Sequence, residues 1–293
     1  MASIDPQVQA RAQQAGFALA RELSEALAAG PVELPSFPEV ALRVQEVLAD
    51  DAVSTELVVR IVGAEPMLAA RVITIANSVA MNPGGSPVTD LRTAVARMGF
   101  DLLRAAAVSF AVAQLRLRAE YRGIQAPLNR LWLDSVAMSA HCAVVARHCR
   151  RISADRALFC GLVANVGRIY LLASASRHPG LLEDQATWQA LQDQWHMSAA
   201  RSLLASWHVN DETIEAIENH QRDDIEPPQA TALSDVLGSA AFLVRHSEVP
   251  EELASGMAKV QALTRLGLNL GDCILLMQKG SDEVAALRAA IGR

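Results

Sequence analysis

Residues Asp101–Leu117 read DLLRAAAVSFAVAQLRL, and this segment decides the fold. Ala and Leu, both strong helix formers, supply most of its apolar residues. The pattern predicts a helix that is apolar almost all round, instead of one with a single apolar stripe. Such a helix has no side suited to water, so we expect it to lie buried between two groups of helices. Immediately before it, Asp90 can cap a shorter helix that Gly99 ends.

On the N-terminal side of this segment the sequence predicts four more helices. Gly30-Pro31 ends the first, Ser54 can cap the third, and Pro66 fits the first turn of the fourth. The predicted ranges are 6–28, 40–48, 55–64 and 66–75, with a Pro- and Gly-rich loop over 77–88.

On the C-terminal side the sequence also predicts helices only. Asn129 can cap the first of them. The predicted ranges are 129–149, 153–161, 169–175, 188–195, 197–207, 211–219, 231–246, 251–266 and 281–291. No run alternates apolar and polar residues over the length of a strand. We therefore predict an all-α fold.

The charge of the chain limits the kinds of partner. A net charge of -6 argues against a general nucleic-acid binder. Between Arg104 and Arg156, however, nine Arg stand against only Glu120, Asp134 and Asp155. This stretch could meet an anionic partner, or it could be a solvated surface whose charges pair with one another.

Composition also indicates the compartment. The four cysteines form no CxxC pair, and three lie in apolar, helix-like runs, as free cysteines of a reducing cytoplasm do. Residues 1–14 lack a basic-then-apolar signal pattern, and no uninterrupted apolar run approaches the ~20 residues of a membrane span. We predict a cytoplasmic protein without a membrane segment.

Several further segments follow one another in a fixed order. They are Leu34–Leu42 (LPSFPEVAL), Glu65–Ser78 (EPMLAARVITIANS), Val88–Gly99 (VTDLRTAVARMG), Leu131-Trp132 with Ser135, and Trp195–Trp207 followed by Ile214–His220. Together they resemble the HDOD family, the HD-related output domain of bacterial signalling proteins, between about Leu34 and His246. The resemblance implies two helical lobes. Residues 33–118 would form the first, and residues 119–293 would form a degenerate HD-type phosphohydrolase fold, with a separate N-terminal helix in 1–32.

The same resemblance points to four positions that carry metal ligands in true HD enzymes. Those enzymes use a first His, a His-Asp doublet and a final Asp, and the metal activates a bound water. Here the positions fall on Asp134, Ala164, Asn165 and Ala241. The doublet lies in Gly161–Arg168, which reads GLVANVGR, and alanine has no lone pair while an asparagine amide is a weaker donor than a carboxylate. We predict no enzymatic activity, no bound metal and no cofactor.

Histidines elsewhere are a weaker alternative source of metal ligands. His141 and His148 lie ~10.5 Å apart along one predicted helix, whereas zinc ligands lie ~2.0–2.3 Å from the ion. One ion cannot bind both histidines unless the helix is broken between them. His196, His208 and His220 are a second set of possible ligands. His196 and His220 match pattern positions of the family, and these two could instead be buried hydrogen-bonding residues that hold helix ends.

The prediction for function is a non-enzymatic signalling or regulatory module that binds another regulatory protein. Candidate contact surfaces are the segments Leu34–Pro38 and Asn77–Val88, together with the Arg-rich stretch that includes Arg116, Arg118 and Arg122.

Three alternatives stay open. The first is a sensor that binds a nucleotide or second messenger in the vestigial cleft without hydrolysis, with Arg168 facing a phosphate. Arg168 could equally form a salt bridge across a helix end. The second is a residual metal-dependent phosphohydrolase. The third is membership of a nucleic-acid complex through the Arg-rich stretch, which the net charge opposes.

Overall fold

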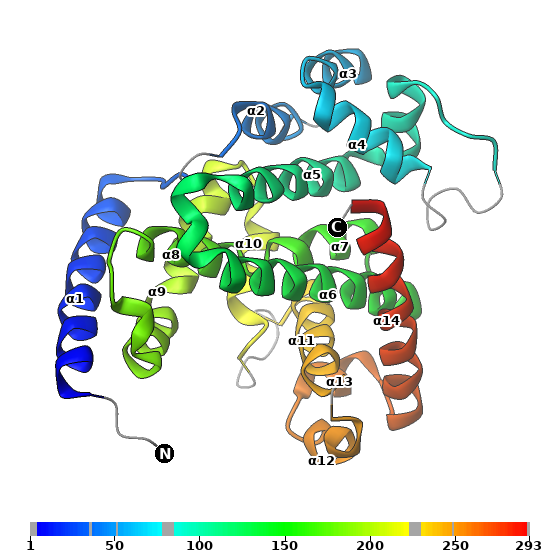
Figure 1. Ribbon diagram of the computed structural model, residues 1–293. Coiled ribbons are helices and arrows are strands. Elements are labelled where there is room, and N and C mark those ends of the chain that lie inside the picture. The colour runs from blue at the N-terminus through cyan, green and yellow to red at the C-terminus, as the bar shows by residue number, and fades with distance from the viewer. Residues whose placement is uncertain are drawn as a thin grey trace.

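The computed structural model describes residues 5–34, 37–50, 52–77, 85–222, 230–247 and 249–291. Every regular element within these ranges is a helix, which confirms the predicted all-α class. Figure 1 shows a smaller group of helices above α5 (Leu91–Leu117) and a larger group around α6 (Gln125–Cys149).

The smaller group packs three helices against α5. These are α2 (Glu39–Val47), α3 (Thr55–Gly63) and α4 (Pro66–Ala76). The side chain of Ser54 accepts a hydrogen bond from the backbone N–H of Leu57, and that of Asp90 accepts one from Thr93, so both predicted caps are confirmed. Buried side chains of the four helices form a core of their own.

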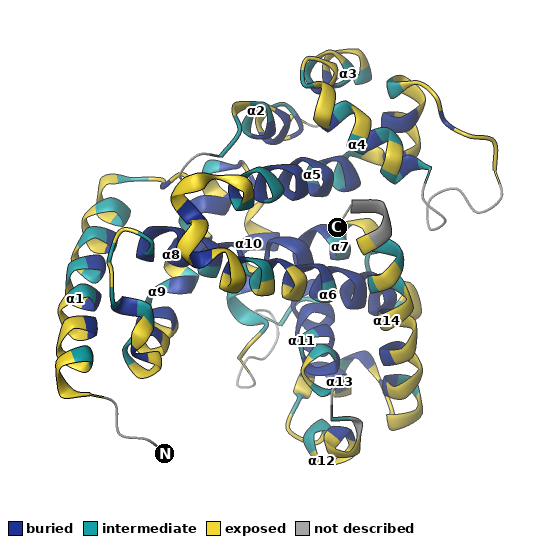
Figure 2. Cartoon of the chain, viewed as in Figure 1, coloured by how far each residue is buried: buried dark blue, intermediate teal, exposed yellow. Residues whose placement is uncertain are grey.

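Helix α5 is buried on two sides. Leu103 and Phe110 belong to the core of the smaller group, whereas Val108 and Val112 belong to the core of the larger group. Gly99 has a φ of 72°, and this left-handed residue breaks α5 into a short first part and the buried second part, as predicted. The central part of α5 is dark blue in Figure 2. Burial between two groups of helices is therefore confirmed.

The larger group forms the main core and also includes the N-terminal helix. Its longer helices are α1 (Pro6–Ala29), α7 (Ala154–Val163), α8 (Val166–Ala175), α9 (Gln185–Ser206), α10 (Asp211–Asn219), α11 (Ala232–His246), α13 (Gln261–Leu266) and α14 (Leu270–Ile291). Helix α1 packs on α9 and contributes Leu19 and Leu23 to this core. Glu22 on the same helix pairs with His178 at 2.9 Å.

Several predicted helix boundaries are wrong. The two helices predicted over 188–207 are one helix, α9, because no Gly or Pro separates them. Asn129 does not cap α6, which begins at Gln125 with Pro127 in its first turn. The last helix begins at Leu270 instead of Ser281. The predicted helix 251–266 is divided into η3 (Pro250–Glu252), α12 (Leu253–Met257) and α13.

Among the described residues, two stretches are long and apolar enough to cross a membrane by composition alone. They are Leu91–Leu117 and Ala154–Ala175, and 67% and 83% of their most apolar windows are buried inside the fold. Their apolar composition is therefore explained by the cores described above.

The segment between α1 and α2 and the loop after α4 are the first two predicted contact surfaces. Leu34 is buried, and the ring of Phe37 stacks on Trp207 with 4.8 Å between centroids, so both serve the core. Residues 35–36 and 78–84 lie outside the described residues. The loop 77–88 is closed at its ends by Asn77, whose side chain donates to and accepts from the backbone of Val88 at 2.7 Å.

Candidate functional site

The corner between α7 and α8 carries Ala164 and Asn165, the two positions predicted to correspond to the HD doublet. Two glycines next to it allow the backbones of neighbouring helices to approach closely. A Cβ at Gly161 would lie 2.8 Å from the Cα of Ser139 on α6, and a Cβ at Gly167 would lie 2.0 Å from the carbonyl oxygen of His196 on α9. Glycine is therefore required at both positions for the backbones to approach this closely.

Arg168 brings two of the predicted histidines together. Its guanidinium lies 3.4 Å from Nε2 of His196, which is buried on α9. Its charge also acts on His220 at the end of α10. The three residues come from α8, α9 and the end of α10, so they converge only in the folded chain.

Backbone carbonyls fix the orientation of both histidine rings. Nδ1 of His196 donates to the carbonyl oxygen of Gln192 at 2.6 Å, and Nδ1 of His220 donates to that of Ile217. In the neutral form each ring therefore presents Nε2 as an acceptor. For His196 this acceptor faces the guanidinium of Arg168.

Burial and positive charge keep both rings neutral. Burial lowers the pKa of His196, and Arg168 lowers it further. Burial, with smaller effects from Arg168 and His196, lowers the pKa of His220 to about 4. Burial also lowers the pKa of the Arg168 guanidinium, although the charges of Asp193 and Asp134 oppose that shift.

The four positions that the resemblance assigns to HD ligands lie around this cluster. Asp134 is exposed on α6 but close enough for its charge to act on Arg168. Ala164 is buried and Asn165 is half-buried at the corner. Ala241 lines the same cavity as His220. Among the described residues no group of three or more His, Cys, Asp or Glu side chains is placed to hold a metal ion.

Sequence reasoning missed the arginines of that cavity. We call it the arginine pocket: it measures about 200 Å³, lies between the end of α10, α11 and α13, and is lined among others by Asn219, His220, Arg222, Ala241, Arg245 and Arg265. The one signal in the sequence is the spacing of Ala241 and Arg245, which places them on one face of a helix. Nothing local indicates that Arg222 and Arg265 join them.

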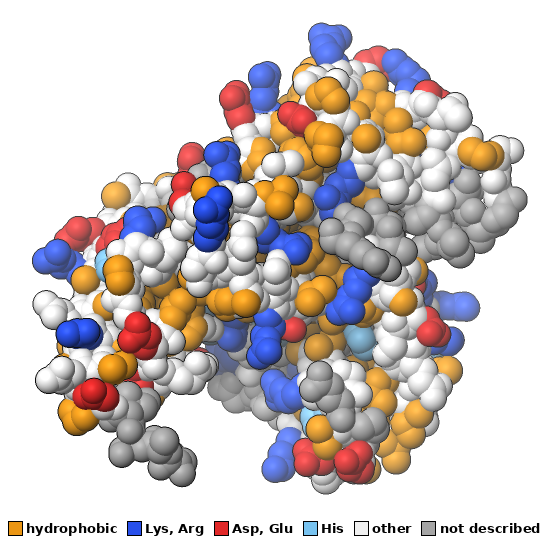
Figure 3. All heavy atoms as spheres, viewed as in Figure 1, with side chains coloured by type: hydrophobic (Ala, Val, Ile, Leu, Met, Phe, Trp, Pro, Cys, Tyr) orange, Lys and Arg blue, Asp and Glu red, His pale blue; other side chains and the backbone are white. Residues whose placement is uncertain are grey.

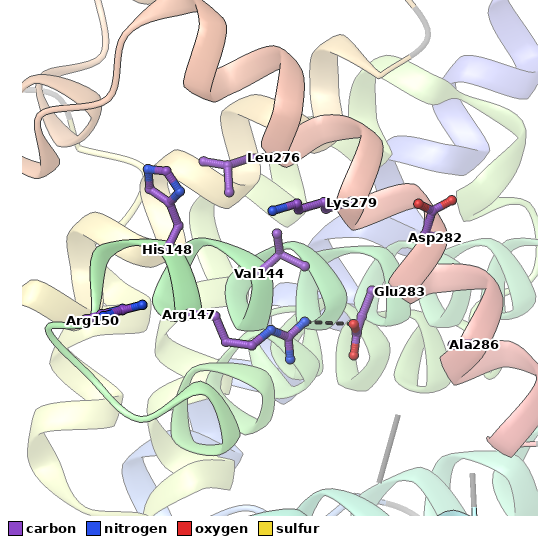
Figure 4. Close-up of a pocket in the computed structure, with 9 residues that line it drawn as sticks. All are labelled: Val144, Arg147, His148, Arg150, Leu276, Lys279, Asp282, Glu283 and Ala286. Carbon is purple, nitrogen blue, oxygen red and sulfur yellow. Dashed lines mark hydrogen bonds and ion pairs between the residues drawn. The ribbon is translucent and has the colours of Figure 1, made fainter. Parts of the chain in front are cut away.

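A second groove of about 620 Å³ runs between α6 and α14 (Figure 4). Arg147, Arg150 and Lys279 line it, but so do Asp282 and Glu283. Arg147 pairs with Glu283 at 2.7 Å, as the dashed line shows. Opposite charges therefore largely cancel along this groove.

The other predicted histidines do not join the cluster. His141 is buried against α14, where a Cβ at Gly280 would lie 2.3 Å from its ring. His148 faces Asp272 at 3.7 Å. His208 is exposed and has a left-handed φ of 54° at the end of α9.

The Arg-rich stretch does not form one surface. Arg156 pairs with Glu212 at 2.8 Å, and Arg116 donates a hydrogen bond to Asn129. Arg118 is exposed between α5 and η1 (Ala119–Ile124), and Arg122 is exposed within η1. Figure 3 shows basic side chains spread among acidic ones over the visible face.

Acid is expected to destabilise the protein through His220. Folding lowers the pKa of this residue from 6.5 to about 4, so between these values the unfolded chain binds a proton that the folded chain does not. The stabilisation is complete above pH ~6.5 and falls as the pH drops toward ~4. Because the ring is partly exposed, we expect the free energy of unfolding to fall by about 2 kcal/mol, less than the full shift implies.

Urea denaturation at pH 7, 5.5 and 4.5 measures this loss of stability. In the variant His220→Asn the curve should be flatter by about that amount, and an unchanged curve would contradict the assignment.

Comparisons with known proteins support the resemblance to the HDOD family. The sequence profile of the HDOD domain matches residues 34–223. A search of curated proteins finds no match. A candidate metal-dependent phosphohydrolase from Shewanella amazonensis SB2B has a TM-score of 0.74 and 24% identity, covering 97% of this chain and 100% of that chain. An HDOD domain protein with unknown function from Geobacter sulfurreducens has a TM-score of 0.62 and 21% identity, covering 94% and 96%.

A candidate signal transduction protein from Marinobacter aquaeolei VT8 has a TM-score of 0.62 and 18% identity, covering 96% of this chain and 66% of that chain. At these identities the structural likeness shows the fold alone. The HDOD/HD-like phosphohydrolase fold that the resemblance implied is confirmed. Since the family profile matches residues 34–223 of a chain of 293, the protein belongs to the HDOD domain family.

Proposed function

We propose that this protein is a non-catalytic regulatory module of signal transduction that works in the cytoplasm by binding another regulatory protein. The observation that carries the proposal is the state of the HD ligand positions. Ala164 and Ala241 offer no lone pair, and Asn165 offers only a neutral amide. His196 and His220 are placed near Arg168, whose charge opposes a metal cation at the same spot.

The test combines metal content with hydrolysis. The protein is purified after expression with Mn, Fe and Zn available, and its metal content is measured by mass spectrometry. We expect well below one metal per chain and no hydrolysis of nucleotide phosphomonoesters or cyclic dinucleotides above a heat-denatured control. A stoichiometric metal together with turnover would overturn the non-catalytic reading and support the residual phosphohydrolase.

The turn between α5 and η1 is a predicted contact surface whose residues are all described. Leu117 is 77% exposed there, Arg118 follows it directly, and Arg122 is exposed within η1. An exposed apolar side chain near exposed arginines suits an acidic partner surface. Arg116 is not part of this contact surface, because its side chain donates a hydrogen bond to Asn129 and so stabilises the fold.

Charge reversal tests this surface. We expect the double variant Arg118→Glu and Arg122→Glu to reduce recovery of a captured partner at least about tenfold, since like charges across an interface are strongly unfavourable. Quantitative affinity capture with the wild-type chain as reference measures the effect. The variant Arg97→Glu, on an exposed part of α5 away from the turn, is the control. Equal recovery with all three proteins would remove this surface from consideration.

A second candidate function is a sensor that binds a phosphorylated small molecule without hydrolysing it. The observation that favours it is the arginine pocket, which lies beside His220 and Ala241 in the vestigial cleft.

A further inference from the structure

A groove of about 630 Å³ lies on the smaller group of helices, between α2 and α3. The two helices pack against each other at the top of Figure 1, and their buried side chains belong to the core that they share with α5. The described lining comes from the start of α2, from α3 beginning at Leu57, and from Glu65 just after α3. None of these lining residues is buried, so the groove opens to the surface. We call it the α2/α3 groove.

Apolar side chains run along the α2/α3 groove. They are those of Val40, Leu57, Ile61 and Ala64. Leu57 is 39% exposed and belongs to neither hydrophobic core of the described chain. Met67, two residues beyond Glu65, is 64% exposed. In Figure 3 hydrophobic side chains are visible over this group of helices, with acidic and basic ones beside them. Apolar side chains exposed together are typical of a surface that another molecule covers.

Four charged side chains also line the α2/α3 groove. They are the carboxylates of Glu39 and Glu65 and the guanidinium groups of Arg43 and Arg60. Within the described residues none of the four forms an ion pair. In this respect the groove differs from the one between α6 and α14, where Arg147 pairs with Glu283 at 2.7 Å. The charges of the α2/α3 groove are therefore available to a partner.

The sign of these charges changes along the groove. Glu39 is the first residue of α2, and Glu65 follows the end of α3. Arg43 lies one helical turn into α2, and Arg60 lies one turn before the end of α3. Because the start of α2 and the end of α3 line the same groove, the carboxylates lie toward one end of it. The guanidinium groups follow about 6 Å further along the helices. The groove thus has an acidic end and a basic end.

We propose that the α2/α3 groove docks a second copy of this chain in a two-fold symmetric dimer. In such a dimer the same surface meets itself, so the surface has to be complementary to itself. A two-fold axis perpendicular to α2 and α3 places the acidic end of one copy on the basic end of the other. It also places the apolar side chains of the two copies against each other, at the centre of a four-helix arrangement. Complementary charges fix the register of an interface, and here the complement of the groove is the groove itself.

The mass of the full chain across a concentration series tests the proposal first. Sedimentation velocity is measured up to about 1 mM, where weak association becomes detectable. We expect the mass to rise with concentration from the 31.4 kDa of one chain to twice that value and no further. A chain that stays monomeric over this range would overturn the proposal and leave the groove to a different protein. Continued growth beyond two chains would also overturn it, because a two-fold contact closes at the dimer.

Two charge-reversed variants test the arrangement of the dimer. Arg43→Glu with Arg60→Glu makes the groove acidic throughout, and Glu39→Arg with Glu65→Arg makes it basic throughout. We expect each variant alone to self-associate at least about tenfold more weakly than the wild type, because like charges then meet at the interface. An equimolar mixture is expected to regain dimers with one copy of each variant, since opposite charges again meet at both ends. Native mass spectrometry identifies this mixed dimer.

The mixture also separates lost charge complementarity from a lost fold, because an unfolded variant cannot restore the dimer. Glu65 accepts a hydrogen bond from the backbone N–H of Met67 at 3.3 Å, so its replacement removes a helix cap. Glu39→Arg alone leaves that cap in place and is expected to act in the same direction as the double variant. Folded variants that stay monomeric in the mixture would contradict the two-fold arrangement. Dimers that persist in each variant alone would place the interface elsewhere.

The apolar part of the groove has its own test. We expect Leu57→Asp to weaken self-association by at least about tenfold, because it places a charge among apolar side chains at the interface. Leu270→Asp is the matched control, since Leu270 is 42% exposed and also lies in the first turn of its helix, α14. An aspartate is favourable in the first turn of a helix, so both variants should fold. Equal association of the two variants would overturn the assignment of the groove.

These measurements are independent of the proposed function. Metal content, hydrolysis and capture of a partner through Arg118 and Arg122 do not depend on the mass of the chain in solution. A chain that stays monomeric therefore leaves the non-catalytic module standing, and failure of the module leaves the association data interpretable.

Discussion

Gly167→Ala is expected to lower the free energy of unfolding by at least about 3 kcal/mol. The added Cβ would lie 2.0 Å from the carbonyl oxygen of His196 and 2.9 Å from the backbone N of Ala200. Both atoms belong to the backbone of α9, so no side-chain rotation can relieve the contact. The gain in helix propensity, about 1 kcal/mol, is too small to compensate. Helices α8 and α9 must separate, and this displaces Arg168 from His196.

Urea denaturation followed by circular dichroism measures this loss. Gly123→Ala is the matched control, because a Cβ at Gly123 meets nothing within 4 Å and the residue is exposed. We expect the control to stay within about 0.5 kcal/mol of the wild type. If Gly167→Ala were as stable as the control, the close crossing of α8 and α9 would be wrong. If Gly167→Ala does not fold at all, the difference from Gly123→Ala still carries the conclusion.

Gly280→Ala is expected to lower the free energy of unfolding by about 2–3 kcal/mol. Helix α14 crosses α6 so closely that the new Cβ would lie 2.3 Å from Cδ2 and Nε2 of His141. Here the obstacle is a side chain, so partial adjustment makes the loss smaller than at Gly167. Gln278→Ala, on the exposed side of the same helix, is the control and should change little.

A double-mutant cycle isolates this contact. His141→Ala removes the ring, and Nε2 of that ring is buried without a hydrogen-bond partner among the described residues. We expect Gly280→Ala to cost at least about 1 kcal/mol less in the His141→Ala background than in the wild type, because its Cβ then occupies the space of the ring. Additive losses would show that the two residues do not meet.

Local signals in the sequence correctly predicted where some of the helices begin. Ser54 and Asp90 cap their helices as predicted, since capping involves only the next three residues. Boundaries failed where the local signal was ambiguous. Gly280 is a poor helix former, yet it lies inside α14, where the crossing with α6 leaves no room for a Cβ. The predicted break within α9 had no Gly or Pro to enforce it.

The sequence by itself determined the all-α class and the burial of most of Asp101–Leu117. These follow from periodicity and from residue chemistry, which are local properties. Only the tertiary structure decided that Arg168 meets His196 and that Arg222, Arg245 and Arg265 share one pocket. Helix crossings position these residues, and crossings depend on how distant side chains fill a common core.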